Sequence, residues 1–187
     1  MDSGLHGNDQ VCVDRKGEFM KKARGFTLVE ILIVAVLLGV LAAIVIPAIA
    51  DSASSAKQSA LATDLQLLRR FILVYKGQHL EVGPGYPNGN VTAAPTEDAF
   101  VEQATMSSNE AGQTAAVGTA GFNRGPYMQK IPANPLNGKS TVQMLGNGDD
   151  FPANGDDSDG WIYKAATSEI RADSTGTDSN GKRYYDY

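Results

Sequence analysis

The sequence predicts an α+β protein, in which a long amino-terminal helix packs by its second half against a small carboxy-terminal antiparallel β-sheet. Three observations lead to this prediction. An apolar run covers residues 26–50, an apolar stripe with helical spacing follows between Leu61 and Tyr75, and two strand-like segments lie within residues 161–171. Helix and strand patterns therefore occupy separate parts of the chain, which is typical of this fold class.

The apolar run is long enough to cross a membrane. At about 1.5 Å per residue, a helix over residues 26–50 spans the ~30 Å hydrocarbon core of a bilayer. Thr27 and Glu30 carry its only polar side chains, and a short basic stretch at residues 21–24 precedes it. Because a carboxylate costs about 2.5–3.5 kcal/mol at the centre of a bilayer, Glu30 requires a partner.

The helix is expected to continue beyond the apolar run. Residues 51–60 are small and polar and contain neither Gly nor Pro. Apolar residues then recur at spacings of three and four, which makes residues 51–79 an amphipathic continuation with one buried stripe. The stripe consists of Leu61, Leu65, Leu68, Ile72 and Tyr75. Gly77 is expected to begin the end of this helix.

Residues 80–187 are expected to form a globular head with loops. A short helix is predicted near residues 97–106, with Thr96 as its N-cap and with Phe100, Val101 and Ala104 on its buried face. Residues 107–121 are poor in bulky side chains and are predicted to form a mobile loop.

A β-hairpin is predicted near residues 161–171. Trp161-Ile-Tyr-Lys and Glu169-Ile-Arg are rich in aromatic and β-branched residues and are separated by about four turn residues. The tail at 182–187 is expected either to frame the surface of the head or to extend its last strand.

Composition excludes several classes of protein. Lys and Arg number 16 against 21 Asp and Glu, so the net charge is −5, and no basic patch interleaved with aromatic residues predicts nucleic-acid binding. After the first 25 residues the only histidine is His79, and no nucleophile or phosphate-binding motif accompanies it. We therefore expect no enzyme, and we interpret His79 as a cation that suits the end of a helix.

An acidic loop lies just before the first strand-like segment, which begins at Trp161. Five carboxylates fall within residues 149–159 among several glycines, and they are Asp149, Asp150, Asp156, Asp157 and Asp159. Ca²⁺ prefers six to eight oxygen ligands, which a glycine-rich turn with many carboxylates can supply. The spacing does not match an EF-hand, and solvated turns have similar compositions. Calcium bound by Asp149, Asp157 and Asp159 is one hypothesis, and a plain solvated turn is the other.

The start of the apolar run carries the motif Gly25-Phe26-Thr27-Leu28-Val29-Glu30 behind a basic leader. It resembles the prepilin cleavage and methylation motif of type IV pilins and of the pseudopilins of type II secretion. The resemblance implies a type IV pilin-like fold, cleavage between Gly25 and Phe26 by a prepilin peptidase, and N-methylation of Phe26. It also implies that Glu30 pairs with the Phe26 amine of a neighbouring subunit, and that Pro47 matches a helix-breaking proline of the family. A kink or local loosening is expected at Pro47 because it removes a backbone donor.

Two further features favour a pseudopilin. The segment 125–138 resembles a proline-rich segment of the major pseudopilin, whose family binds calcium in a loop before the final strands. The only cysteine, Cys12, lies in the leader, so the disulfide common in type IV pilins cannot form. The resemblance therefore implies a structural subunit of a type II secretion pseudopilus, anchored by a single pass in the inner membrane with its head in the periplasm. Its expected partners are further copies of itself, minor pseudopilins, the prepilin peptidase and the inner-membrane assembly platform.

Alternatives remain open at this stage. The chain could be a type IV pilin for adhesion, motility or DNA uptake. Alternatively, Ala48-Ile49-Ala50 could end a secretory signal, so that a soluble domain is released after Ala50. The leader is expected to comprise residues 1–25, or a shorter segment if translation begins at Met20.

Overall fold

The computed structural model describes residues 25–187, apart from the side chains of residues 47, 48, 50 and 51. All of the predicted leader except Gly25 lies outside these residues, and so does Cys12. The chain divides into two units, one that ends at Ile49 and one that covers Ala50–Tyr187. The first unit contributes the apolar segment, and the second contains the head.

Helix α1 covers Leu28–Gln78 and confirms the long helix. It passes Gly77, and the chain turns away at Leu80 and Glu81, whose φ values of 56° and 63° lie in the left-handed region. There the backbone N–H of Glu81 donates to the carbonyl of Lys76 at 3.1 Å, which satisfies one of the free carbonyls of the last turn. The helix assignment is continuous across Pro47, so the kink stays a prediction.

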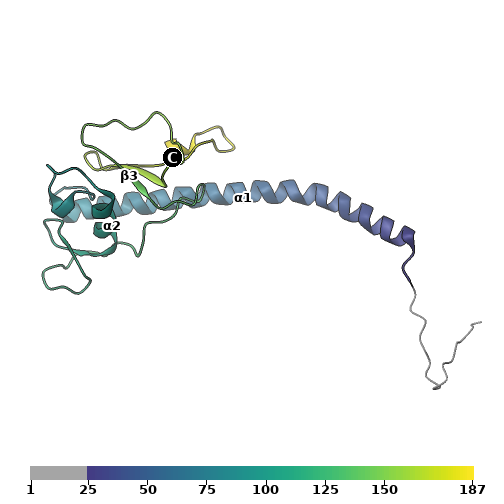
Figure 1. Cartoon of the computed structure of the whole chain (residues 1–187), viewed down its shortest axis with the longest axis horizontal. Helices are drawn as coiled ribbons and strands as arrows, with labels where there is room; N and C mark the ends of the chain where they lie inside the picture. Colours follow the sequence, from purple (N-terminus) through teal and green to yellow (C-terminus); the bar gives the residue numbers. More distant parts are fainter. Residues whose placement is uncertain (1–24) are drawn as a thin grey trace, which may run out of the picture. The chain divides into compact units, whose positions relative to one another are not determined.

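The core of the head is built on the second half of α1 (Figure 1). All five residues of the predicted stripe are buried, with no more than 3% of any of them exposed, as at Ile72. Phe100, Trp161 and Tyr163 pack against this stripe and are fully buried. The period of three and four residues therefore identified the inner face of the helix correctly.

Helix α2 covers Glu97–Thr105, and the Thr96 hydroxyl caps it by accepting from the Ala99 N–H at 3.3 Å. Phe100 and Ala104 are buried as predicted, but Val101 is only half-buried. Val101 borders an open groove beside residues 129–131, and Gln103 is buried instead. The pattern missed this position because a polar side chain occupies it.

The sheet in the head has the order β3-β4-β5, formed by Val142–Leu145, Trp161–Lys164 and Glu169–Ala172. Strands β4 and β5 form the predicted antiparallel hairpin. Strand β3 pairs with β4 in parallel, so the sheet is mixed and the prediction of a purely antiparallel sheet needs this correction. Two parallel neighbouring strands require a crossover connection of about a dozen residues or more, and residues 146–160 form this connection between β3 and β4. We call residues 146–160 the acidic crossover.

Both faces of the sheet are covered. Trp161 and Tyr163 face the core on α1, whereas Ile162 packs with Leu145 and Tyr185. This alternation is the two-residue period of a strand, and it explains why β4 is apolar on both sides. Tyr185 belongs to η2, a short 3-10 helix at Tyr184–Asp186, so the tail frames the sheet.

The segment 107–121 contains a small β-ladder, which corrects the prediction of a mobile loop. Strand β1 at Ser107–Ser108 pairs antiparallel with β2 at Thr114–Ala115. Both serines are buried, and the Ser108 side chain reaches His79 near the end of α1. A contact across so many residues leaves no signal in the local sequence. A second 3-10 turn, η1, covers Pro87–Gly89.

Candidate functional site

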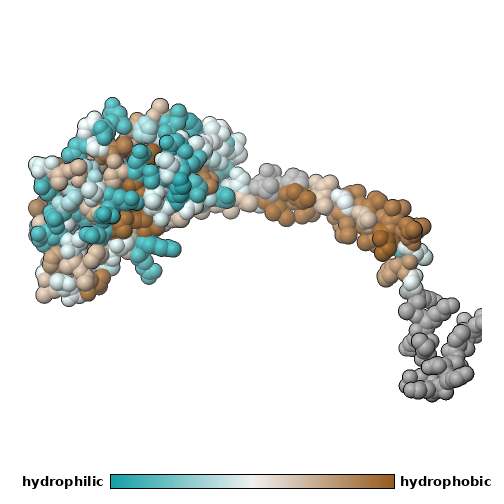
Figure 2. All heavy atoms as spheres, in the orientation of Figure 1, coloured by the Kyte–Doolittle hydropathy of each residue, from teal (hydrophilic) through white to brown (hydrophobic). Residues whose placement is uncertain are grey.

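The apolar part of α1 exposes large side chains around the helix. Leu28–Ile46 has a mean hydropathy of 3.1, none of it is buried, and among residues 25–187 it is the helical stretch long and apolar enough to cross a membrane. Figure 2 shows the visible face of this segment covered by apolar residues. A helix that is apolar on every side suits lipid or the interior of a helical bundle.

Thr27 and Glu30 form a capping box at the start of α1. The Glu30 Oε2 atom accepts from the Thr27 backbone N–H at 3.1 Å and from the Thr27 hydroxyl at 3.1 Å. In return, the Thr27 hydroxyl oxygen accepts from the Glu30 N–H at 3.2 Å. These contacts satisfy amide groups that a helix start leaves free. The carboxylate therefore has a partner within its own chain, one turn from the predicted cleavage site.

Gly25 and Phe26 precede the helix and have no regular structure. Phe26 is 79% exposed. A Cβ atom placed on Gly25 would meet nothing within 4 Å, so packing within the described chain does not demand glycine there.

The acidic crossover does not gather the three predicted calcium ligands. The Asp149 carboxylate accepts from the Gly146 N–H at 2.9 Å, whereas the Asp157 carboxylate accepts from the Thr175 N–H at 3.3 Å. The Asp159 carboxylate lies 3.4 Å from the Ser158 hydroxyl. Within the described residues, no group of three or more His, Cys, Asp or Glu side chains is placed to hold a metal ion. These residues do not fit a calcium site as arranged, so calcium stays a prediction that requires the loop to rearrange.

Asp173 is the acid that organises this region. It is fully buried, and its carboxylate accepts from the N–H groups of Asp156 and Asp159, both at 2.8 Å. The Ser158 hydroxyl also donates to it, at 3.1 Å. Asp173 directly follows β5, so its partners are separated from it by the whole hairpin. Because of this distance along the chain, the role of Asp173 could not be predicted from the local sequence.

His79 lies in a buried cluster rather than at an exposed helix end. It is 2% exposed and stacks on Tyr75 with ring centroids 3.7 Å apart. Its Nδ1 lies 2.7 Å from the Tyr75 carbonyl, and its Nε2 lies 2.9 Å from the Ser108 hydroxyl. Because a carbonyl only accepts, Nδ1 carries the proton and Nε2 accepts from Ser108. Burial lowers the pKa of His79 despite the opposing effect of the Tyr75 carbonyl, so the interpretation of His79 as a cation was wrong.

Comparisons with known proteins agree with the amino-terminal motif. The family model described as the prokaryotic N-terminal methylation motif matches residues 20–46. Type II secretion system core protein G of Klebsiella pneumoniae is 31% identical over 69% of this chain and 79% of its own length. The protein of the same name from Aeromonas hydrophila is 30% identical over 69% of this chain and 78% of its own length. The chain belongs to the pseudopilin family of type II secretion system core protein G. No solved structure matches it significantly.

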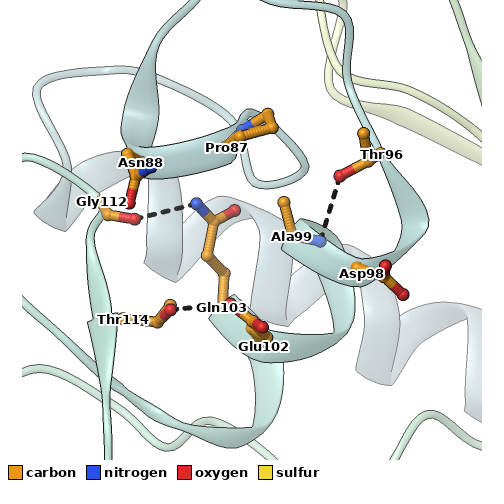
Figure 3. Close-up of a pocket in the computed structure, with 9 residues that line it drawn as sticks. All are labelled: Pro87, Asn88, Thr96, Asp98, Ala99, Glu102, Gln103, Gly112 and Thr114. Atoms are coloured by element: carbon orange, nitrogen blue, oxygen red, sulfur yellow. Dashed lines mark hydrogen bonds between the residues drawn. The ribbon is translucent and has the colours of Figure 1, made fainter.

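The head of this pseudopilin has a polar pocket of about 210 Å³ beside α2 (Figure 3). Gln103 forms its inner wall, and its amide donates to the carbonyls of Tyr86 and Gly112 at 2.9 and 3.0 Å. The same amide accepts from the Gly85 N–H at 2.7 Å. Glu102 accepts from the Thr114 hydroxyl at 2.8 Å. These side chains hold α2 to the neighbouring loops of the pseudopilin head.

The capping box could have been found in the sequence. Thr27-x-x-Glu30 directly before an apolar run is the pattern of a helix start, but we interpreted Glu30 only as a costly charge in the membrane that requires a partner. The structure thus gives this pseudopilin residue a role in its own chain, besides any role between chains.

Proposed function

We propose that this pseudopilin is a structural subunit of a type II secretion pseudopilus, added to the filament through its amino-terminal helix. The observation that carries the proposal is the capped start of α1, where Glu30 opens a helix whose apolar surface is exposed from Leu28 to Ile46. The match to the methylation motif and the family of the chain support it. Such a helix lacks a partner within the described chain, and copies of itself would supply one.

Processing comes first in this proposal. The prepilin peptidase cuts between Gly25 and Phe26 and then methylates the new amine of Phe26. The bond lies outside α1, so no helical hydrogen bond has to break before the backbone enters an active site. The basic stretch of the leader stays on the cytoplasmic side, as positively charged residues next to a membrane span commonly do.

Assembly then uses two charges that are each costly in lipid. The Phe26 amine is a cation and Glu30 is an anion. If the two pair between neighbouring subunits, neither charge stays unpaired in an apolar environment. The two charges meet only when the helices of neighbouring subunits have the correct axial register. Glu30 exchanges its contact with the Thr27 N–H for the incoming amine or keeps both, since a carboxylate accepts several hydrogen bonds.

The location follows from the same helix. The subunit waits in the inner membrane as a single-pass protein with its head on the periplasmic side, and an inner-membrane assembly platform transfers it to a filament of like subunits and minor pseudopilins. Loosening of α1 at Pro47 would help the helix to bend while the subunit is extracted from the bilayer.

The mature amino terminus tests processing. Mass spectrometry of the native membrane fraction is expected to find a peptide that begins at methylated Phe26. The variant Gly25→Val should accumulate uncut precursor because a branched side chain obstructs the extended backbone, whereas Ala50→Val should be processed normally. A native terminus at Asp51, blocked by Ala50→Val, would instead show a secreted soluble domain and end the pilin interpretation.

Two variants separate the charge of Glu30 from its capping role. Glu30→Gln keeps an acceptor for the Thr27 N–H but removes the charge, since glutamine also serves in capping boxes. Thr27→Val keeps the charge and removes the hydroxyl. Filament yield after mechanical shearing should collapse for Glu30→Gln and fall far less for Thr27→Val. Normal assembly of Glu30→Gln would contradict the charge pair.

Secretion itself is the second readout. Loss of the gene should leave exported proteins inside the cell envelope while surface pili and twitching continue. The reverse outcome, intact secretion with lost piliation, would assign the chain to a surface pilus.

A further inference from the structure

The acidic crossover is held by side chains that donate to its backbone carbonyls. Four consecutive carbonyls, those of residues 157–160, accept from one turn at residues 134–139, which we call the Asn-Lys turn. The Lys139 ammonium donates to the carbonyls of Asp157 and Ser158, both at 2.8 Å. Asn137 Nδ2 donates to the Asp159 carbonyl at 2.7 Å, and Asn134 Nδ2 donates to the Gly160 carbonyl at 2.9 Å.

The position of Lys139 is fixed by its backbone. Its N–H donates to the Asn137 side-chain oxygen at 3.0 Å, and its carbonyl accepts from the Asn134 N–H at 2.8 Å. A Cβ atom on Gly160 would lie 2.2 Å from the Lys139 carbonyl oxygen, so only glycine permits this approach. The Asn-Lys turn therefore lies directly against the end of the crossover, and the ammonium needs only its own stem to reach the two carbonyls.

Two backbone N–H groups of the same crossover also have partners. Asp173 accepts from the N–H groups of Asp156 and Asp159, as described above. A Cβ atom on Gly155 would lie 2.6 Å from the Ser174 backbone nitrogen, which brings the crossover against the residues after β5. The carbonyls of residues 157–160 and the amides of Asp156 and Asp159 thus have partners, although residues 155–160 form no helix or strand.

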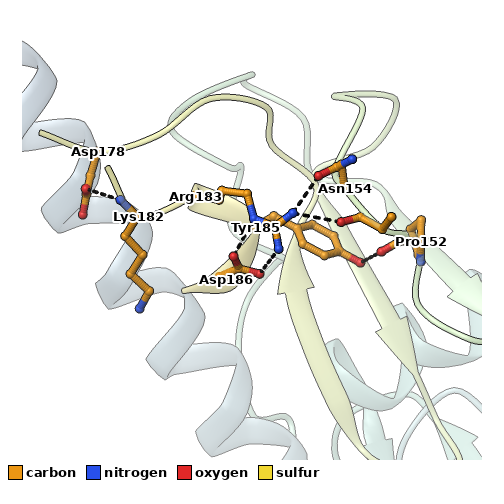
Figure 4. A network of polar contacts seen from close by, with 8 residues as sticks. Pro152, Asn154, Asp178, Lys182, Arg183, Tyr185 and Asp186 are labelled. Carbon is orange, nitrogen blue, oxygen red and sulfur yellow. Dashed lines mark hydrogen bonds and ion pairs between the residues drawn. The ribbon is translucent and has the colours of Figure 1, made fainter. Parts of the chain in front are cut away.

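Two other cations contact the crossover nearer its start. The Lys164 ammonium donates to the Asp149 carbonyl. The Arg183 guanidinium donates to the Ala153 carbonyl at 3.0 Å and to the Asn154 side-chain oxygen at 2.7 Å (Figure 4). Tyr185 adds a hydrogen bond to the Pro152 carbonyl at 2.6 Å. Cationic side chains therefore reach the crossover at three separate points.

Backbone carbonyls and carboxylates are also the ligands that Ca²⁺ takes in loops. Here the carbonyls of Asp157 and Ser158 are already bound to an ammonium group that the chain itself supplies. A metal ion bound to these carbonyls would have to displace the Lys139 ammonium, because two cations would otherwise lie side by side. We propose that Lys139 and the Asn-Lys turn replace a metal ion in this pseudopilin, so that the acidic crossover folds without calcium.

The test uses the full chain in detergent and the fluorescence of Trp161, the only tryptophan, which directly follows the crossover. Thermal unfolding is compared in excess EDTA and in millimolar calcium chloride. Lys139→Met removes the ammonium and keeps the stem. Lys130→Met is the matched control, because Lys130 is exposed and makes no hydrogen bond or ion pair within residues 25–187. Lys139→Arg keeps a cation at the same place.

Wild-type protein is expected to unfold at the same temperature in EDTA and in calcium. Lys139→Met should lower that temperature by about 3–8 °C, Lys130→Met by about 1 °C or less, and Lys139→Arg should lie nearer the wild type. Faster proteolysis within residues 146–160 of Lys139→Met, with an unchanged pattern in the control, would support the same role.

Two results would overturn the proposal. One is wild-type protein that loses stability in EDTA and regains it with calcium, which would establish a metal site in the crossover. The other is a Lys139→Met variant that unfolds like Lys130→Met. If Lys139→Met does not fold at all, the comparison of wild type in EDTA and calcium still decides, because it needs no variant.

Discussion

The two halves of α1 belong to one helix but meet different surroundings. In the first half, large side chains such as Leu28 and Val45 are 86% and 49% exposed, and none of Leu28–Ile46 is buried. In the second half, Leu61, Leu65 and Leu68 are at most 1% exposed, whereas Leu73 on another face is 71% exposed. The second half is a one-sided helix completed by its own head, and the first half requires lipid or other copies on every side.

This difference teaches that sequence periodicity separates two kinds of burial. Apolar residues at spacings of three and four form a stripe that packs against the rest of the same chain. An apolar run without a polar face packs instead against lipid or other molecules. A substitution should therefore act on the fold in one half and on location in the other.

The largest effect is expected from Leu68→Ala. Leu68 is 0% exposed, so the truncation leaves a cavity and should lower the free energy of unfolding of the head by about 2–5 kcal/mol. The neighbouring Leu67 is 44% exposed, and Leu67→Ala should cost less than about 1 kcal/mol. Urea unfolding monitored by Trp161 fluorescence measures both. Equal losses would mean that α1 does not bury one face.

Leu37→Asp should act on membrane retention and leave the head intact. A carboxylate in the middle of the apolar segment costs about 2.5–3.5 kcal/mol, which is roughly a hundredfold change in partition. Leu73→Asp, on the exposed face of the second half, is the control and should stay in the membrane fraction. Carbonate extraction followed by immunoblotting gives both fractions, and equal retention of the two variants would disprove a membrane-spanning first half.

His79 should make the head sensitive to mild acid. Burial lowers its pKa in the folded state below the ordinary value of 6.5, so the unfolded chain takes up the proton first as the pH falls. Stability should be complete above about pH 6.5 and should fall below it by up to about 1.4 kcal/mol per pH unit. Urea unfolding at about pH 7.5 and about pH 5.5 tests this window. His79→Gln should flatten the profile, and a wild-type profile that is already flat would show that His79 is not held neutral.

The smallest effect is expected at the start of α1. Thr27→Val removes the capping hydroxyl and should destabilise the first turn by about 1 kcal/mol. Amide hydrogen exchange in detergent should become several-fold faster at Glu30 and Ile31, with no change around Leu65. Unchanged exchange at Glu30 would indicate that the apolar surroundings hold the first turn without the cap.

The sequence predicted what depends on local patterns. The N-cap at Thr96, the buried stripe and the β4–β5 hairpin all follow from spacing and propensity, and the structure confirms them. The observed bounds of α1 and α2 differ from the predicted ones by no more than two residues at either end. The motif at Gly25 and Phe26 identified the family correctly. Cleavage, methylation and the pairing of Glu30 between subunits stay predictions.

Features that depend on distant partners were not predicted. Strand β3 was missed because its neighbour β4 lies beyond the acidic crossover, and the ladder β1–β2 was missed because its serines are polar although buried. The roles of Asn134, Lys139 and Asp173 rest on contacts across 14 to 40 residues of sequence. A lone lysine or aspartate among turn residues carries no local sign of such a partner.

The parallel pairing of β3 with β4 has a consequence for the order of folding. Strand β3 can join the sheet only after the crossover has closed, and Tyr185 of η2 covers the outer face of β4. Non-local pairing of this kind is slow compared with helix formation. Because Tyr185 and the strands all lie carboxy-terminal to α1, the head is expected to complete its sheet after α1 has formed. During that interval the apolar face of α1 is formed but not yet covered, and a chaperone or protease would meet the head in an unfinished state.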